Sequence, residues 1–493
     1  MKIFSQKLST SIFGKHCNYT PIAIIAVGLL SGCAVGPKQD SPEISTPGYF
    51  KNDSINPLTT GYSIPNPLWW KEFGDPILDS FVDRAMDNSP DMDAAFARVE
   101  RASALAGISK SSLFPSVDFT GSALRQRTSG NTGSKTILSN KFSNALGLAW
   151  EVDLWGRVRH LKNSAETSAE AEARSYDYAV LTLRAKVVEA YFNIRVLDKT
   201  IEILKQTANY RESTLKLVQL RKSSGLGDEL ELAQSNTELF ATLADLSARK
   251  RERALAENAL AILVGAFSSE FSLTADATWD FPAVKVPQAL PSELLRRRPD
   301  VLEAELLMRA ASSKIGAVYA DYFPRVTLTG NLGFAASDIN KLYARDSLFG
   351  SMGPSISWNV FNSGLTESIV EQAKADYTEL AALYRKQILT AFGQVEDALA
   401  SLKHLQAETT ARAQAATSAQ RAAKLARERY QSGIIGNLEV IDTERSALNT
   451  AQTSLQSRST QLMQSIELIR ALGGGWLSIE GTNIKDSSTE ELP

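Results

Sequence analysis

Hydrophobic residues recur along this chain with two different periods. Between Gly156 and Ser223, which enclose no proline and no further glycine, apolar residues recur every three or four positions, the spacing of a coiled-coil seam. The seam positions are Val180, Leu183, Val187, Ala190, Ile194, Leu197, Ile201, Leu204 and Ala208. A second seam consists of Tyr384, Ile388, Ala391, Val395, Ala398, Leu402 and Leu405. We therefore expect two long helices, at about 157–223 and 365–432, each roughly 100 Å long at 1.5 Å per residue.

Two segments with alternating apolar and polar residues precede each long helix. Alternation places the apolar side chains on one face of a strand, as for Val326, Leu328, Leu332 and Phe334. The pattern predicts strands at about 115–128, 141–154, 324–336 and 352–361, joined by polar loops at 128–141 and 337–347. This pattern is typical of a soluble sheet on a core, but its length also fits the roughly ten residues that a membrane strand needs.

The alternating segments and the long helices occur twice because the chain is a tandem duplication. The following pairs of sites lie 209 or 208 residues apart: Pro90-Asp91 and Pro299-Asp300, Gly107 and Gly316, Phe114-Pro115 and Phe323-Pro324, Trp150 and Trp358, Gly225 and Gly433. We expect repeats at 90–280 and 281–472. In each repeat a glycine-bearing turn leads to a returning helix, at about 229–264 and 437–472. Shorter helices at about 91–113 and 300–322 precede the strands.

The N-terminus has the pattern of an export signal. Lys2, Lys7 and Lys15 precede an apolar stretch from Pro21 to Leu30, which is too short to span a membrane. The sequence Leu30-Ser31-Gly32-Cys33 resembles a bacterial lipobox, so residues 1–32 are predicted to be a lipoprotein signal peptide and Cys33 the acylated first residue. Because Ala34 and not Asp follows the cysteine, the sorting rule for such lipoproteins implies the outer membrane. Residues 33–89 are then an N-terminal anchor and equatorial segment.

Composition excludes several classes of protein. The 493 residues carry a formal charge of -2, which argues against nucleic acid as a partner, and no apolar run is long enough for a helical transporter. The two cysteines, Cys17 and Cys33, cannot form a disulfide framework of the mature chain or a cysteine-rich zinc cluster. His160 and His404 lack metal-ligand spacing and are interpreted as solvated helix residues. Because phosphate-loop, nucleophile-elbow and dinucleotide motifs are also absent, we expect no enzyme, no metal and no cofactor.

Four features have two interpretations each. Trp69-Trp70 is a ligand platform or, more simply, packs the N-terminal segment onto the helices. Arg296-Arg297-Arg298 is a nucleic-acid patch or pairs locally with acids at a helix start. Glu151 and Asp153 line a lumen or are the wetted side of a strand. Residues 473–493 read as a flexible tail with no assigned role.

Four strands cannot close a barrel, which needs about eight or more. A sheet that faces lipid cannot leave its edges unpaired either, so closure has to come from several subunits. Three chains would supply twelve strands.

Several motifs together resemble a known family. They are Leu30-Ser31-Gly32-Cys33-Ala34-Val35-Gly36-Pro37, Trp69-Trp70-Lys71-Glu72-Phe73-Gly74-Asp75-Pro76, Leu294-Leu295-Arg296-Arg297-Arg298-Pro299-Asp300 and Val395-Glu396-Asp397-Ala398-Leu399. In this order, over Cys33 to about Leu472, they resemble the TolC-like outer membrane factors. The lipoprotein (NodT-type) branch, which serves resistance-nodulation-division efflux systems, is the most similar.

The resemblance implies a mainly α fold with a membrane β-barrel: a homotrimer whose twelve-stranded barrel joins a twelve-helix periplasmic α-barrel. It implies a lipid-anchored outer-membrane exit duct that passively conducts drugs or toxic compounds. The implied partners are outer-membrane lipid, a periplasmic adaptor and a proton-driven inner-membrane resistance-nodulation-division pump. The only implied non-protein group is the S-diacylglycerol and N-acyl lipid on Cys33.

In this family the hairpin tips close the periplasmic entrance, so the matching gate positions are Gly225, Leu226, Gly227, Asp228, Gly433, Ile434, Ile435 and Gly436. Some relatives carry an aspartate in the second tip, where this chain has Ile434 and Ile435. We expect either an apolar constriction made by these isoleucines or packing within the tip.

Two other functions fit parts of the pattern. A structural coiled-coil lipoprotein without a pore would explain the anchor and the seams, but not four alternating segments. A type I secretion duct for proteins would share the fold, and the lipobox favours drug efflux over it.

Overall fold

The computed structural model describes residues 35–36, 47, 50–51, 68–132, 137–282 and 297–474. The predicted signal peptide, Cys33, Arg296 and nearly all of the C-terminal tail lie outside these residues.

The chain divides into two compact units. Unit 1 contains the described parts of Met1–Asp40, Ala106–Ala165 and Ala310–Asp376. Unit 2 contains those of Ser41–Leu105, Glu166–Arg309 and Tyr377–Pro493.

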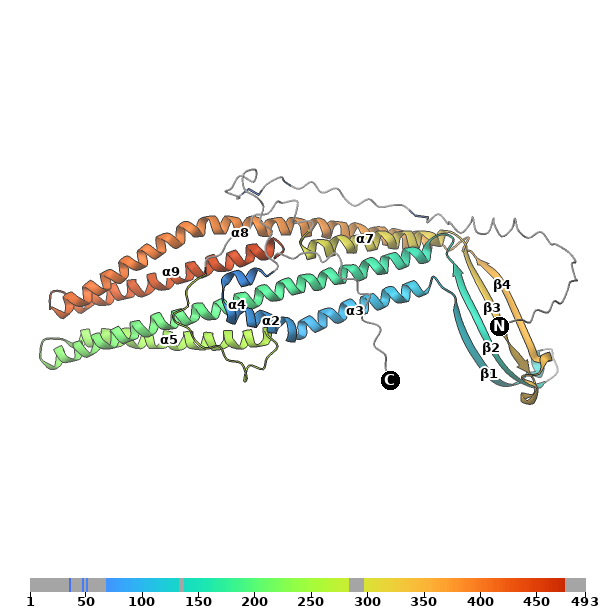
Figure 1. The fold of residues 1–493 in the computed structure, drawn as a ribbon, viewed down its shortest axis with the longest axis horizontal. Helices are drawn as coiled ribbons and strands as arrows, with labels where there is room; N and C mark the ends of the chain where they lie inside the picture. Colours follow the sequence, from blue (N-terminus) through green and yellow to red (C-terminus); the bar gives the residue numbers. More distant parts are fainter. Residues whose placement is uncertain are drawn as a thin grey trace, which may run out of the picture. The chain divides into compact units, whose positions relative to one another are not determined.

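Unit 1 contains a four-stranded antiparallel sheet, drawn as arrows in Figure 1. Its strands are β1 (Ser116–Arg127), β2 (Leu138–Val152), β3 (Arg325–Ala336) and β4 (Leu348–Ser357), in the order β1-β2-β3-β4. The register puts Phe119 opposite Leu146 and Leu146 opposite Leu332, so apolar side chains share one face. This face is uncovered within one chain, since Phe119 is 71% and Met352 73% exposed.

The fourth strand differs from the prediction of 352–361. It begins four residues earlier, at Leu348, and ends at Ser357, which pairs with Arg325 at the start of β3. Trp358 and Val360 extend the alternating pattern, but Pro324 precedes Arg325 and has no backbone N–H to donate to a ladder. Strand β2 also begins earlier than predicted, at Leu138, because Leu138 pairs with Arg127.

Two long helices and two returning helices form hairpins in unit 2 (Figure 1). They are α4 (Arg157–Ser223) with α5 (Glu229–Leu263) and α8 (Leu365–Gln431) with α9 (Asn437–Ala471); the first turns of α4 and α8 belong to unit 1. The expected seam residues are buried or half-buried, with Val187, Ile194 and Leu204 fully buried. Helix–helix packing thus follows the three-and-four spacing read from the sequence.

The shorter elements are the 3₁₀ helix η1 (Trp69–Phe73) and the helices α2 (Pro76–Asn88), α3 (Pro90–Ser111) and α7 (Pro299–Tyr319), which η3 (Ala320–Tyr322) extends. Short 3₁₀ turns lie in the strand connections, η2 (Gly130–Thr132) in the first and η4 (Ile339–Lys341) and η5 (Arg345–Ser347) in the second. Trp69 and Trp70 are buried in the main core of unit 2, with the Arg184 guanidinium 4.8 Å from the Trp70 ring. The packing interpretation of this pair is therefore confirmed.

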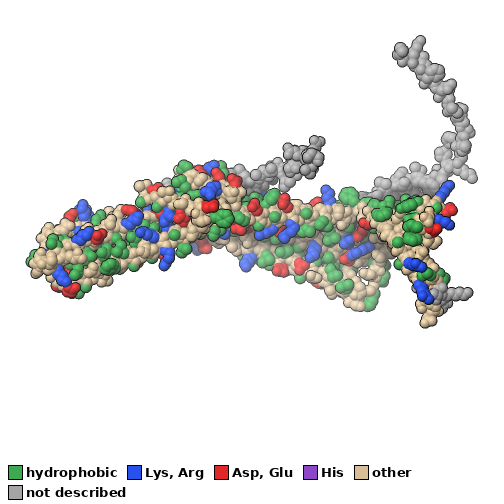
Figure 2. Space-filling model, turned by 90° about the horizontal axis from the view of Figure 1, so that it is seen from below, with side chains coloured by type: hydrophobic (Ala, Val, Ile, Leu, Met, Phe, Trp, Pro, Cys, Tyr) green, Lys and Arg blue, Asp and Glu red, His purple; other side chains and the backbone are tan. Residues whose placement is uncertain are grey.

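No helix in the described part of the chain has the length and apolar character needed to cross a membrane. On the face drawn in Figure 2, acidic and basic side chains are interspersed along the described helices.

Arg298 joins three helices of unit 2 from a buried position. Its guanidinium binds both carboxylate oxygens of Asp300, at 3.0 and 2.7 Å, and donates to the Ala471 carbonyl at 3.0 Å. Gln387 of α8 donates to the same carboxylate. The local pairing predicted for the arginine run is confirmed for Arg298.

Arg298→Ala would leave the Asp300 carboxylate buried without its charge partner. We expect a loss of about 3–5 kcal/mol in folding stability, seen as a lower apparent midpoint in thermal unfolding of the purified protein. The control is Arg249→Ala, which removes an exposed ion pair with Glu252 and should cost at most about 1 kcal/mol. Equal shifts for the two variants would contradict this role of Arg298.

Candidate functional site

The predicted gate positions lie at the ends of the two hairpins. In the first, α4 ends at Ser223, and Gly225 adopts a left-handed conformation, with φ of 75°, before α5 begins at Glu229. In the second, Gly433 does the same with φ of 73°. The Leu226 N–H donates to the Arg221 carbonyl and the Ile434 N–H to the Arg429 carbonyl, both at 2.9 Å. Both tips therefore use the same glycine-dependent helix ending.

The two tips start their returning helices differently. Asp228 caps α5, because its carboxylate accepts the Glu231 N–H at 2.8 Å. Lys222 also forms an ion pair with Glu229 across the first turn. At the second tip the N-cap is Gly436, which has no side chain to accept a hydrogen bond. The first tip is thus tied by side chains in a way that the second is not.

The structure separates the two isoleucines of the second tip. Ile435 is half-buried and packs against a small core of Val218, Ala426, Tyr430 and Val440. Ile434 is 71% exposed, similar to Leu226 of the first tip at 72%. Ile435 therefore has the packing role, and only Ile434 is available to form an apolar constriction.

A buried cluster of charges, here called the hairpin ion cluster, joins the two hairpins. It consists of Arg211 on α4, Glu238 on α5, Arg427 on α8, and Glu444 and Arg445 on α9. Arg211 Nη2 lies 2.9 Å from Glu238 Oε2, and its Nη1 donates to the Glu238 carbonyl at 2.7 Å. Arg445 donates to the same Glu238 carboxylate from the other hairpin. Glu238 is thus shared by both hairpins.

Glu444 is held less tightly than Glu238. Its carboxylate lies 3.4 Å from Arg427 and 3.9 Å from Arg211. Burial raises the pKa of Glu444 above its ordinary value, and the two arginines only partly oppose this shift. Tyr210 of α4 also packs its ring 4.1 Å from the Arg427 guanidinium. Glu444 is therefore a carboxylate of the cluster that accepts a proton more readily than an ordinary glutamate.

The sequence analysis missed this cluster, although a signal was present. Arg211 follows Ala208 by three residues and precedes Leu215 by four, so it occupies a seam position where an apolar residue is expected. A charged residue at a seam position is typical of a specific partner across the helices.

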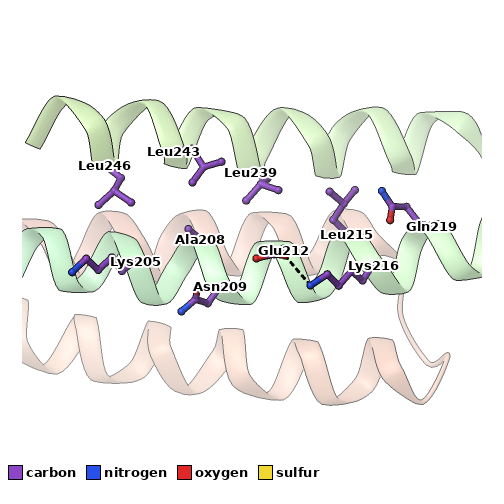
Figure 3. A pocket seen from close by; sticks show the side chains of 10 residues that line it. All are labelled: Lys205, Ala208, Asn209, Glu212, Leu215, Lys216, Gln219, Leu239, Leu243 and Leu246. Carbon is purple, nitrogen blue, oxygen red and sulfur yellow. Dashed lines mark ion pairs between the residues drawn. The ribbon is translucent and has the colours of Figure 1, made fainter. Parts of the chain in front are cut away.

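A groove of about 410 Å³ runs between α4 and α5 (Figure 3). Helix α4 supplies polar side chains such as Lys205, Asn209 and Gln219, whereas α5 supplies Leu239, Leu243 and Leu246. We assign no ligand to it.

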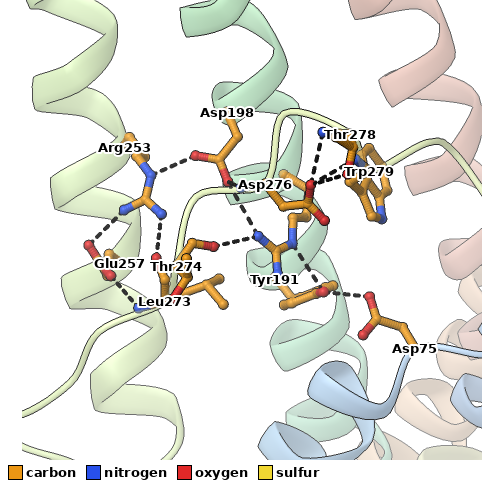
Figure 4. Close-up of polar contacts among 11 residues, drawn as sticks. Asp75, Tyr191, Asp198, Arg253, Glu257, Leu273, Thr274, Asp276, Thr278 and Trp279 are labelled. Carbon is orange, nitrogen blue, oxygen red and sulfur yellow. Dashed lines mark hydrogen bonds and ion pairs between the residues drawn. The ribbon is translucent and has the colours of Figure 1, made fainter.

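A second polar network fastens the loop after α5 to the helices (Figure 4). Asp198 on α4 accepts from Arg253 of α5 at 2.7 Å and from the Asp276 N–H at 3.2 Å. Arg195 donates to the Thr274 carbonyl at 2.8 Å, and Tyr191 bonds Asp75, the N-cap of α2. Burial, together with the bond to Asp75, raises the pKa of Tyr191, which therefore stays a neutral donor. This network has a structural role.

The remaining candidates fall outside any lumen site. Glu151 forms a two-point ion pair with Arg157, at 2.8 and 2.6 Å, and Asp153 accepts the Val158 N–H at the start of α4. Both carboxylates are thus used at the strand-to-helix junction. His404 is exposed as predicted, but His160 is half-buried and packs against Gly316, so its interpretation as a solvated residue was wrong.

Comparison with known proteins shows the family. The model described as "Outer membrane efflux protein" matches residues 81–266 and 290–474. The toluene efflux pump outer membrane protein TtgC of Pseudomonas putida is 31% identical over 476 residues, covering 94% of this chain and 96% of that protein. The cation efflux system protein CusC of Escherichia coli K12 is 28% identical over 459 residues, covering 93% and 99%.

The solved outer-membrane channel OprN has the same fold, with a TM-score of 0.83 and 30% identity over 90% of this chain and 100% of that one. The family resemblance and the mainly helical fold expected from the sequence are confirmed, and the function is outer-membrane efflux. This chain belongs to the outer membrane efflux protein family.

Proposed function

We propose that three copies of this chain form a continuous exit duct. The observation that carries the proposal is the four-stranded sheet, in which β1 and β4 are both edges and the apolar face is uncovered. Two copies would supply eight strands, and a barrel of that size is filled by its own side chains. Three copies supply twelve strands and leave room for a solute.

We propose that the duct is passive and completes a tripartite pump. The energy would come from a proton-driven resistance-nodulation-division pump in the inner membrane, which a periplasmic adaptor couples to the helical hairpins. The names of the relatives support export of small toxic compounds, because they include toluene and cation efflux proteins. Each chain would be anchored in the outer membrane by the lipid on Cys33.

We propose that the hairpin tips are the gate. Gly225 and Gly433 shape the two turns, and Ile434 is the exposed apolar side chain of the second tip. Three copies of Ile434 around the axis would form a constriction that resists wetting. The hairpin ion cluster would hold the two hairpins of each chain together in the closed state.

Substitution of the two isoleucines distinguishes gating from packing. Ile434→Ser should raise antibiotic and dye entry in cells that lack the pump, because the constriction becomes wettable, with little loss of stability. Ile435→Ser should instead lower stability by about 1–2 kcal/mol, because it removes half-buried packing. Ile434→Val keeps the apolar surface and serves as the control. Unchanged permeability in Ile434→Ser would refute the apolar gate.

The raised pKa of Glu444 predicts a pH dependence. Because its folded-state pKa lies above that of the unfolded chain, the folded form binds more protons as the pH falls into this window. Its contribution to stability therefore improves on acidification and worsens as the pH rises. Between about pH 7 and about pH 5, the thermal midpoint of Glu444→Gln should fall below that of the wild type by an increasing margin.

Comparison of two variants isolates this effect, since other carboxylates titrate equally in both. Glu212→Gln, which removes an exposed carboxylate paired with Lys216, should keep the wild-type pH response. An unchanged pH response in Glu444→Gln would show that Glu444 does not titrate in this window.

A further inference from the structure

The short N-terminal stretch Val35-Gly36 makes backbone contacts inside unit 1. The Val35 N–H donates to the Trp155 carbonyl at 3.1 Å, just after the end of β2. Gly36 has a φ of 136°, and a Cβ built on it would lie 3.0 Å from the Gly316 Cα. A side chain at Gly36 is therefore disfavoured by both its conformation and its neighbour.

Gly316 on α7 is enclosed from a second direction. A Cβ on Gly316 would lie 2.6 Å from the His160 ring, so the histidine occupies the space next to the helix backbone. The equivalent residue of the first repeat, Gly107, has no atom within 4 Å of a built Cβ. The glycine is thus sterically required only at Gly316, where α7 offers a notch between Gly36 and His160.

Aromatic residues mark the level at which this contact occurs. The Trp155 indole donates to the Pro324 carbonyl at 2.7 Å and stacks on Phe323, with ring centroids 4.9 Å apart. Trp358 donates to the Tyr322 carbonyl at 3.1 Å. These residues lie where the strands meet the helices, and aromatic side chains are favoured at the membrane interface. In an outer-membrane channel this end of the sheet faces the periplasm.

We propose that Val35-Gly36 is a docked strap that fixes the lipid-bearing N-terminus at the periplasmic end of the sheet. Cys33 precedes Val35 by two residues, and the covalent chain limits that span to about 7 Å. Acyl chains on Cys33 therefore enter the inner leaflet beside Trp155 and Phe323. The lipid is a fixed depth marker for the strands and not a loose tether. The inference rests on the proposed lipidation of Cys33.

Amide hydrogen exchange of the purified full-length protein in lipid nanodiscs tests the docking. In the wild type the Val35 amide should exchange slowly, because it is bonded to Trp155. Gly36→Ala should accelerate this exchange at least about tenfold. Val35→Ala keeps the backbone donor and should retain slow exchange. Rapid exchange in the wild type, or no change in Gly36→Ala, would overturn the strap.

Photo-crosslinking tests where the lipid enters the membrane. Cells are fed a diazirine fatty acid that is incorporated into the lipoprotein, and crosslinked peptides are identified after irradiation. Crosslinks from the wild type should fall on the peptides containing Trp155 and Phe323, and Gly36→Ala should disperse them. Dispersed crosslinks in the wild type would overturn the fixed depth. Intact mass without added lipid would refute acylation of Cys33, while slow exchange at Val35 would still show docking.

Discussion

Backbone hydrogen bonding at the edges of a lipid-facing sheet is the constraint on which the rest of the structure depends. Among the described strands, β1 and β4 each pair with one neighbour, so each leaves a row of N–H and C=O groups open. In hydrocarbon each unpaired group costs several kcal/mol, since water is absent. The exposed Phe119, Met352 and Ile356 face outward on the same sheet. One chain therefore carries a part of a barrel, and the assembly supplies the missing partners.

Gene duplication produced two similar halves whose details have since diverged. Both tips keep a left-handed glycine, but only the first has a side-chain cap, from Asp228. Both short helices keep a glycine, but only Gly316 touches another backbone. Such differences assign separate tasks to equivalent positions: the second tip presents Ile434, and the second short helix receives the N-terminal strap.

Much of the fold could be predicted from the sequence because single periods dominate long stretches. The seam around Val187 and Ile388 predicted helices whose packing follows that spacing, and a glycine in each tip predicted its turn. The end of β4 was wrong because alternation continues through Trp358, whereas strand pairing stops at Ser357. Where pairing stops depends on the partner strand, which a local pattern does not contain.

The candidate site was predicted less completely. The tip residues were found from their glycines, but the hairpin ion cluster unites residues as distant in sequence as Arg211 and Glu444. The distinction between Ile434 and Ile435 likewise depends on which of two adjacent side chains meets Val440 across the hairpin. Glu151 and Asp153 looked like lumen charges because their partners, Arg157 and the Val158 N–H, follow the strand in the next helix.

Closure of the sheet by neighbouring copies is the central claim, and the mass of the assembled protein tests it most directly. Native mass spectrometry of the purified protein, released from detergent, should give a complex of three chains. A single chain as the stable species, with β1 and β4 left unpaired, would contradict the account.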